Sequence, residues 1–168
     1  MRRNLILVWC LLALAYVNAQ PKKFMVRTVA FYNVENLFDT INDPHKFDDD
    51  RTPDGADRWT SKVYNDHVQK IAKVLSEIGT DVTHHAPDII GVAEIENDAV
   101  LTDLINTPYL KKYNYGIVHY ESPDARGVDV ALLYKQGVFK PSSSKKIISD
   151  LSYFNFSAIL VYPLSSFS

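Results

Sequence analysis

Apolar and polar positions along the chain define two strand-like runs with a helical segment between them. The first run, Val26–Asp39, contains Asn33, and the second, Asp88–Asn97, contains Glu94. Between them, Ser61–Ile78 has apolar residues at positions i, i+4, i+7, i+11 and i+14, which form one stripe along a helix. The order strand, helix, strand predicts a βαβ crossover, in which the two strands are parallel members of one sheet. The pattern therefore predicts an α/β fold.

Residues that flank the helical segment indicate where it begins and ends. Thr60 or Ser61 can cap its start, and Gly79 suits the left-handed residue just after its end. The preceding segment, Thr40–Arg58, is rich in Asp, Pro and Gly and has little periodicity. We therefore expect a long exposed loop before the helix.

The chain after the second run predicts a short helix followed by two strands, at Asp98–Ile105, Tyr113–Tyr120 and Val128–Tyr134. The Pro-Asp and Arg-Gly pairs of Glu121–Gly127 indicate a hairpin or a wider loop between these strands. If the short helix is also a crossover, the strand after it runs parallel to the first two. Its following loop, with Asp124 and Arg126, then opens onto the edge at which the first two strands end.

Asn33 and Glu94 are predicted to meet at that edge, because parallel strands end on the same side of a sheet, where α/β proteins usually bind ligands. A carboxylate such as Glu94 is costly to bury unpaired after an apolar run. Mg²⁺ removes that cost, since it takes one or two carboxylates, several waters and a substrate phosphate. Glu35 and Glu96 lie two residues further along an extended chain and so share the face. Arg126 offers planar donors that match phosphate.

An interpretation without a ligand fits the same spacing. Glu94 then pairs with Arg126 or with a lysine, and Asn33 caps a turn. Buried ion pairs are common structural devices, so the spacing alone does not separate the two interpretations.

The N-terminus has the pattern of a secretory signal. Two arginines precede an apolar run, Leu5–Tyr16, and Val17-Asn18-Ala19 supplies a cleavage site with small residues. The run is too short for a comfortable transmembrane span. We therefore expect residues 1–19 to be a signal peptide and the mature protein to be secreted or periplasmic. A lipoprotein signal that uses Cys10 is the alternative.

Composition excludes several kinds of site and argues against one class of partner. Cys10 is the only cysteine, so cleavage leaves no disulfide, thiolate metal site or cysteine nucleophile. Loss of the two signal arginines changes the formal net charge from −2 to −4. This acidic balance is not the broad electrostatic footprint of a tight, non-specific DNA-binding protein.

The last segment, residues 147–168, differs from the rest of the chain. It contains one charged residue, Asp150, and is rich in Ser and Phe. This change in composition indicates a frameshift or a premature end near Lys146. The alternative is a genuine edge strand around Ala158–Tyr162, although that run has few of the charges that protect an exposed edge.

The segments FYNVENLFD, DIIGVAEIEN and SPDARGVDVALLY resemble the opening motifs of the endonuclease/exonuclease/phosphatase superfamily, which is DNase I-like, and are most similar to its exported bacterial members. The resemblance covers about residues 24–146, the N-terminal half of such a domain. It implies a two-sheet α/β sandwich, here incomplete. It also implies metal-dependent cleavage of phosphodiesters or phosphomonoesters, with Mg²⁺ or Mn²⁺ as cofactor.

The resemblance also implies roles for individual residues. Glu94 matches the family's metal ligand, and Asn33 matches the residue that contacts the metal site or the phosphate. Arg126 lies in a region where members contact substrate. Together with the spacing argument, this gives Glu94, Asn33 and Glu35 as metal-site residues, Asn33, Glu94 and Arg126 as catalytic residues, and Asn33, Arg126 and Asp124 as substrate-binding residues.

The chain departs from the family after these motifs. The superfamily continues with an Asp-x-Asn pair and a terminal Asp and His that activate water, but no histidine follows His119, and Asp150 is the only acidic residue after Asp129. The sequence therefore predicts a phosphoesterase that is inactive or weak as this chain. Nucleic acid, a sugar phosphate and a lipid head group remain open as substrates. The alternatives are a non-catalytic exported domain, in which Glu94 makes only a structural ion pair, and a folding-impaired fragment.

Overall fold

The computed structural model describes residues 25–151 and 154–166, and the surroundings of side chains as far as Ile147. The signal peptide expected at residues 1–19 lies outside these ranges. Among the helices that are described, none combines the length and the apolar character needed to cross a bilayer.

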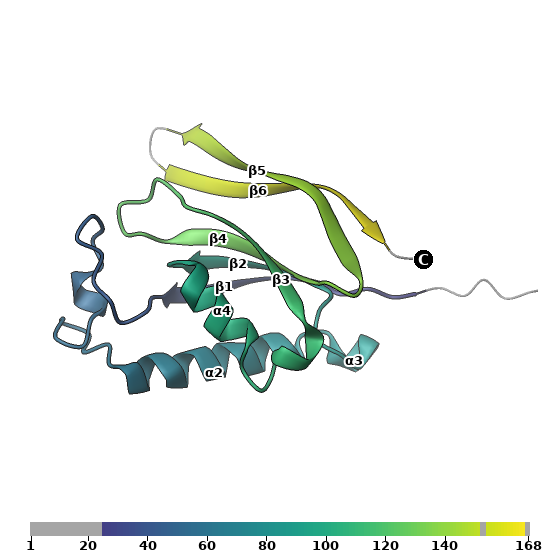
Figure 1. Cartoon of the computed structure of the whole chain (residues 1–168), viewed down its shortest axis with the longest axis horizontal. Helices are drawn as coiled ribbons and strands as arrows, with labels where there is room; N and C mark the ends of the chain where they lie inside the picture. Colours follow the sequence, from purple (N-terminus) through teal and green to yellow (C-terminus); the bar gives the residue numbers. More distant parts are fainter. Residues whose placement is uncertain (1–24, 152–153, 167–168) are drawn as a thin grey trace, which may run out of the picture.

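A four-stranded mixed sheet is the centre of the fold (Figure 1). Its strands lie in the order β1-β2-β4-β3, with β1 parallel to β2, and with β4 antiparallel to both β2 and β3. The third strand in sequence therefore points the same way as the first two, as predicted, although β4 separates it from them. The bounds are β1 Val29–Leu37, β2 Ile89–Ile95, β3 Tyr115–Tyr120 and β4 Asp129–Lys135.

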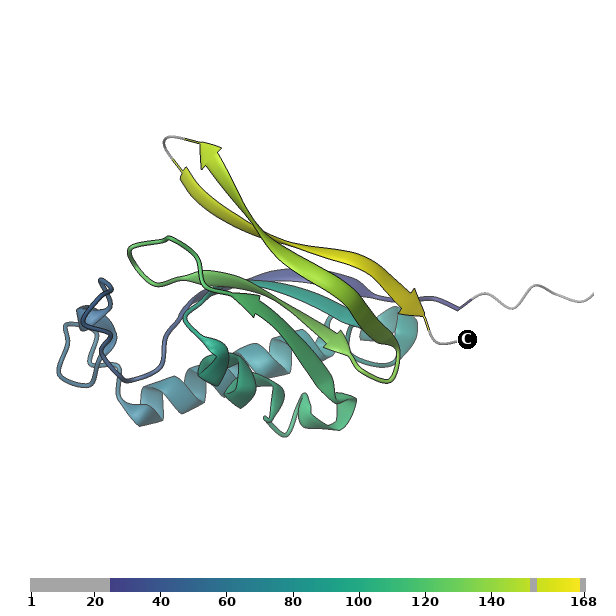
Figure 2. The ribbon, with the colours of Figure 1, turned by 45° about the horizontal axis from the view of Figure 1, so that its top comes forward.

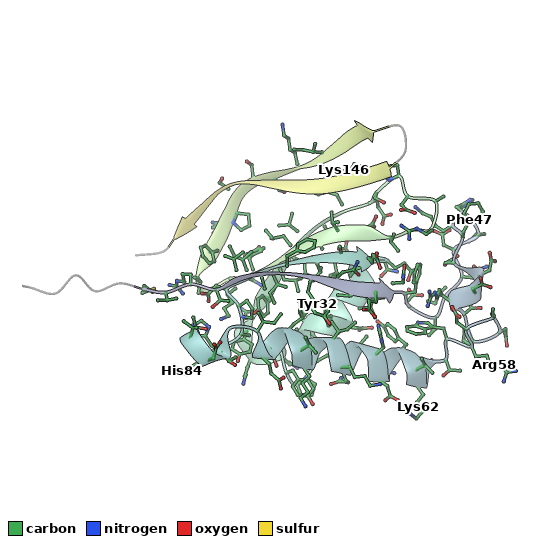
Figure 3. All side chains as sticks on the ribbon, turned by 180° about the vertical axis from the view of Figure 1, so that it is seen from behind. Tyr32, Phe47, Arg58, Lys62, His84 and Lys146 are labelled. Carbon is green, nitrogen blue, oxygen red and sulfur yellow. The ribbon has the colours of Figure 1, made fainter. Side chains whose placement is uncertain are left out.

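The helices cover one face of this sheet (Figures 1 and 2). The helical elements are α2 Ser61–Glu77, α3 Thr80–Thr83, α4 Asp98–Ile105, and the short 3₁₀ turns η1 Asp49–Arg51 and η2 Lys111–Tyr113. The apolar stripe of α2 is buried at Tyr64, Val68, Ile71 and Leu75, where it packs into a core shared with α4 and the sheet. Figure 3 shows Tyr32 of β1 between that strand and α2.

The helix boundaries confirm the predicted capping signals. The Thr60 side chain accepts a hydrogen bond from the backbone N–H of Val63, and Gly79 has a left-handed backbone, with φ of 70°. The sequence did not predict α3. The expected strand at Tyr113–Tyr120 begins two residues late, because η2 ends at Tyr113 and Asn114 is left-handed, with φ of 50°.

A two-stranded antiparallel sheet of β5, Phe139–Leu151, and β6, Phe154–Ser166, lies over the other face of the central sheet (Figure 2). The hydroxyl groups of Tyr120 and Ser144 form a hydrogen bond of 2.6 Å between the two sheets. Lys146 Nζ also donates to the backbone carbonyl of Glu121. The strand that the sequence allowed around 158–162 lies within β6. These layers form an incomplete DNase I-like α/β sandwich, as predicted.

Candidate phosphate and metal site

The carboxyl ends of β1 and β2 are both irregular, and the irregularities lie side by side. Asn33 pairs with Ala93 and Leu37 pairs with Ile95, so three residues of β1 face one residue of β2. Within this interval Glu35, Asn36 and Glu94 are left-handed, with φ of 56°, 60° and 64°. That conformation costs a residue with a side chain about 1–3 kcal/mol. Bulges of this kind re-aim side chains and are common next to active sites.

The bulge in β2 determines where Glu94 points. Val92 and Ile95 are both fully buried in the core on the helical face. With one extra residue between them, the chain keeps both in the core and turns Glu94 away from it, into a half-buried position. Glu94 forms no ion pair with any side chain that the structure describes. The structural ion pair of the alternative interpretation is therefore not found among the described residues.

Asn33 lies at the same edge as Glu94, because its partner Ala93 immediately precedes Glu94. Asn33 is exposed, and β1 does not end at it but continues to Leu37. Its side-chain carbonyl accepts a hydrogen bond of 2.7 Å from the backbone N–H of Glu35. The turn cap of the alternative interpretation is thus present, and the amide NH₂ of Asn33 is left as a donor.

The extended-chain argument for Glu35 loses its premise in this structure. Alternation along a strand assumes extended backbone, but Glu35 and Asn36 are left-handed. Glu35 is exposed, as Asn33 is, and the period-two rule does not apply to this part of β1. A metal-site role for Glu35 stays a prediction, without that support.

Arg126 and Asp124 form a bidentate pair in the loop between β3 and β4. Arg126 Nε lies 3.1 Å from Asp124 Oδ1, and Nη2 lies 2.8 Å from Oδ2. Hydrogen bonding to Arg126 lowers the pKa of Asp124, and the same contact raises the pKa of Arg126. Tyr120, the last residue of β3, pairs with Val130, which in turn pairs with Ala93, the residue before Glu94. The loop therefore opens toward the edge that carries Glu94, as predicted.

A pocket of about 340 Å³ lies where this loop meets the segment after β1. The two segments are joined by a hydrogen bond of 2.9 Å from the Phe47 N–H to the Ala125 carbonyl. Phe47 lies beyond the end of β1 in Figure 3. The ionisable groups that line the pocket are Asp39, Asp43, Lys46, Glu96 and Glu121. Sequence reasoning missed this pocket, because its walls come from loops without periodicity.

Glu96 is the most strongly perturbed carboxyl group of the pocket. Burial raises its pKa to about 7, and the negative charges of Asp39, Asp48 and Asp43 act in the same direction. A short hydrogen bond of 2.6 Å from the Asp39 N–H opposes these effects. The adjacent Asn97 donates to Asp39 Oδ2 and caps α4 by accepting from the Val100 N–H. Glu96 and Asn97 thus tie the ends of β1 and β2 together.

A second cluster lies between β3, β4 and the start of α4. His119 Nε2 is 2.9 Å from Asp129 Oδ2, and His119 Nδ1 is 3.0 Å from Asp98 Oδ1. Burial alone would lower the pKa of His119, but the hydrogen bond to Asp129 and the nearby carboxylate charges raise it. Ligand atoms of His119, Glu121 and Asp129 all lie within 4.8 Å of one another. Sequence reasoning missed this cluster, for which the spacing of His119 and Glu121, two residues apart, was a weak signal.

Comparison with known proteins identifies a family. A sequence model described as the Endonuclease/Exonuclease/phosphatase family matches residues 28–157, most of the chain. The matched range includes every residue of the edge and of the second cluster. A comparison with curated proteins found no match.

Proposed function

The chain belongs to the endonuclease/exonuclease/phosphatase family, and we propose that its sheet edge at Asn33, Glu94 and Arg126 binds a phosphate ester through Mg²⁺ or Mn²⁺. The observation that carries this proposal is Glu94, a half-buried carboxylate in a strained conformation that makes no ion pair with a described side chain. Strain of this kind is typical of functional positions.

The donor groups at the edge fit a hydrated Mg²⁺ ion. Such an ion needs only one or two carboxylates, because waters and substrate phosphate fill its other positions. Glu94 would supply the carboxylate, and Asn33, one strand away, would orient a water or a phosphate oxygen. A cation bound there supplies positive charge that polarises a phosphoryl oxygen.

Arg126 is suited to hold the phosphate itself. Asp124 engages the Nε and one Nη2 donor of its guanidinium, and this contact fixes the plane of the group. The remaining donors are left for a ligand, since a guanidinium carries five N–H groups. The Arg126 side chain is 58% exposed, so a phosphate ester can reach it from solvent. This supports Asp124 as the residue that positions Arg126.

The substrate class follows only in part from these groups. A cation with an arginine accepts nucleic acid, a sugar phosphate or a lipid head group equally well. The formal net charge of −2 argues against a long DNA duplex as a tightly held ligand. We also propose that residues 1–19 act as a signal peptide that directs export of the protein. The protein would then bind its substrate outside the cytoplasm.

Calorimetry with Mg²⁺ on the metal-free chain tests the proposed cation site. We expect wild type to bind Mg²⁺ and Glu94→Gln to lose binding by at least about tenfold, because a neutral amide replaces the carboxylate that we propose as the ligand of the ion. Glu77→Gln, an exposed change on α2, is the matched control and should bind as wild type does. Equal Mg²⁺ affinity in wild type and Glu94→Gln would contradict the proposal and favour a non-catalytic exported domain.

We further propose that this chain hydrolyses phosphodiesters weakly or not at all. In the family's reaction a base deprotonates the attacking water, and no histidine follows His119 to supply one. A chromogenic phosphodiester with Mg²⁺ should therefore turn over no faster with wild type than with Glu94→Ala. Turnover that Glu94→Ala abolishes would refute this second proposal and leave the binding proposal intact.

A further inference from the structure

We propose that His119, Glu121 and Asp129 form a second cation site, selective for a transition metal such as Zn²⁺ over Mg²⁺. His119 lies near the end of β3, Glu121 is the first residue after that strand, and Asp129 begins β4. Their ligand atoms all lie within 4.8 Å of one another. Ligands of a tetrahedral zinc ion, each about 2.0–2.2 Å from the metal, lie about 3.4 Å apart, so small side-chain movements suffice.

The hydrogen bonds of His119 match those of a metal-binding histidine. Such a residue almost always donates its second ring N–H to a carboxylate or a carbonyl, which fixes the ring and its tautomer. Asp98 Oδ1 lies 3.0 Å from His119 Nδ1 and fills this role. Nε2 then points at Asp129 Oδ2, 2.9 Å away. A cation would bind between these two atoms.

Asp129 is held by the backbone in a similar way. Its Oδ1 accepts a hydrogen bond of 2.6 Å from the Ser122 N–H, which leaves Oδ2 for His119 or a cation. The side chains of His119 and Asp129 are only 4% and 1% exposed. Two of the three ligands are therefore already fixed and desolvated before any ion binds.

Glu121 completes the set and provides the entry route. It is exposed and lines the pocket of about 340 Å³, so a cation can reach the buried pair from that side. An imidazole ligand favours Zn²⁺, Cu²⁺, Fe²⁺ or Ni²⁺, whereas Mg²⁺ takes oxygen ligands almost exclusively. The single nitrogen donor is therefore the basis of the expected selectivity.

This site is separate from the one proposed at Glu94. Asp129 pairs with Ile95, so the two sites are on neighbouring strands. However, Asp129 is on the helical face with Ala131 and Leu133, whereas the bulge turns Glu94 away from that face. The inference does not rest on the proposed function, and different variants test the two.

Titration of the metal-free full chain with Co²⁺ reports this site directly, since imidazole and carboxylate ligands give Co²⁺ a characteristic visible absorption. We expect one equivalent of Co²⁺ to produce the bands, Zn²⁺ to displace it, and equimolar Mg²⁺ to leave it in place. Competition with a chromophoric chelator then gives the Zn²⁺ affinity.

Three variants decide the outcome. Glu121→Gln changes an exposed side chain, and Asp98→Asn changes the partner of His119, so both should fold; each should weaken Zn²⁺ binding by about 10-fold to 100-fold. Glu94→Gln should leave the Co²⁺ bands unchanged. If wild type gives no bands, the histidine only bridges two carboxylates and the proposal fails. It fails equally if Zn²⁺ affinity survives Glu121→Gln, since the ion then binds elsewhere, for example at the adjacent His84 and His85.

Discussion

Glu94 holds a left-handed backbone conformation that glycine would adopt without strain. Its φ is 64°, and the register between β2 and β4 is irregular at this residue. Any side chain there contributes strain that glycine lacks, so a carboxylate at this position agrees with a functional role rather than a structural one.

This strain predicts an unusual order of stability between two variants. We expect Glu94→Gly to be more stable than Glu94→Ala by about 1 kcal/mol, because only glycine relieves the left-handed strain. Urea denaturation of both variants measures the difference. At Val118, which lies within the regular part of β3, the order should reverse, with the alanine variant more stable. An alanine variant at Glu94 as stable as the glycine variant would show that the backbone there is not strained.

Glu96 predicts a pH dependence of stability. Its pKa is about 7 in the folded protein, against 4.5 for an ordinary glutamate. Between these values the folded state binds more protons than the unfolded state, so the contribution of Glu96 to stability is lost as pH rises from about 4.5 to 7. Glu96→Gln removes this dependence, because its amide does not titrate but still accepts from the Asp39 N–H.

The measurement is the free energy of unfolding of wild type and Glu96→Gln at pH 5 and pH 8, in the presence of a chelator. The side chain is partly exposed, so we expect Glu96→Gln to gain on the order of 1 kcal/mol relative to wild type across this range. Asp66→Asn, at an exposed helical position, is the control. A constant difference between wild type and Glu96→Gln would mean that Glu96 titrates normally.

At the scale of elements, Asn97 joins α4 to the end of β1. Its carbonyl caps α4 through the Val100 N–H at 3.0 Å, and its NH₂ donates to Asp39 Oδ2 at 3.0 Å. Asn97→Ala should therefore cost about 1–2 kcal/mol, more than Thr60→Ala, since Thr60 only caps α2 and does so at 3.4 Å. A double-mutant cycle with Asp39→Ala isolates the link between the two segments. A coupling energy near zero would show that Asn97 acts as a cap alone.

The sequence predicted those elements whose pattern is regular. α4 has the expected bounds, and α2 ends one residue early, because an apolar stripe over several turns is a strong signal. α3 was missed, since its four residues are too few for a period.

The edge shared by Asn33 and Glu94 followed from chain direction alone. The bulges could not be predicted in this way. The period-two rule assumes extended backbone, whereas Glu35 and Glu94 are left-handed.

The second cluster shows a different limit of sequence reasoning. His119 and Asp98 are 21 residues apart, and they meet only because α4 packs beside β3. Nothing in the local pattern distinguishes Asp98 from an ordinary acidic residue in the first turn of a helix. Contacts of this kind depend on how elements pack, which topology alone does not supply.

At the scale of the whole molecule, the second sheet leaves the edge strand β1 largely uncovered. Ala30 and Tyr32 pack toward the core, so Val29 and Phe31 face the opposite side, where they are 68% and 72% exposed. An apolar edge strand offers both side chains and backbone groups to another chain. A formal net charge of −2 gives little repulsion to oppose such contact.

Phe31→Thr should therefore reduce self-association without destabilising the fold. Threonine keeps the preference for strand and removes an exposed ring, which lies over Gly91. Light scattering over a concentration series should show less association for Phe31→Thr than for wild type, with an unchanged thermal midpoint. Phe38→Thr, at a position only 4% exposed, should instead lower the midpoint, because it removes a buried ring. Equal association in wild type and Phe31→Thr would show that the uncovered face of β1 does not drive contact, and that the incomplete sandwich is adequately protected as it stands.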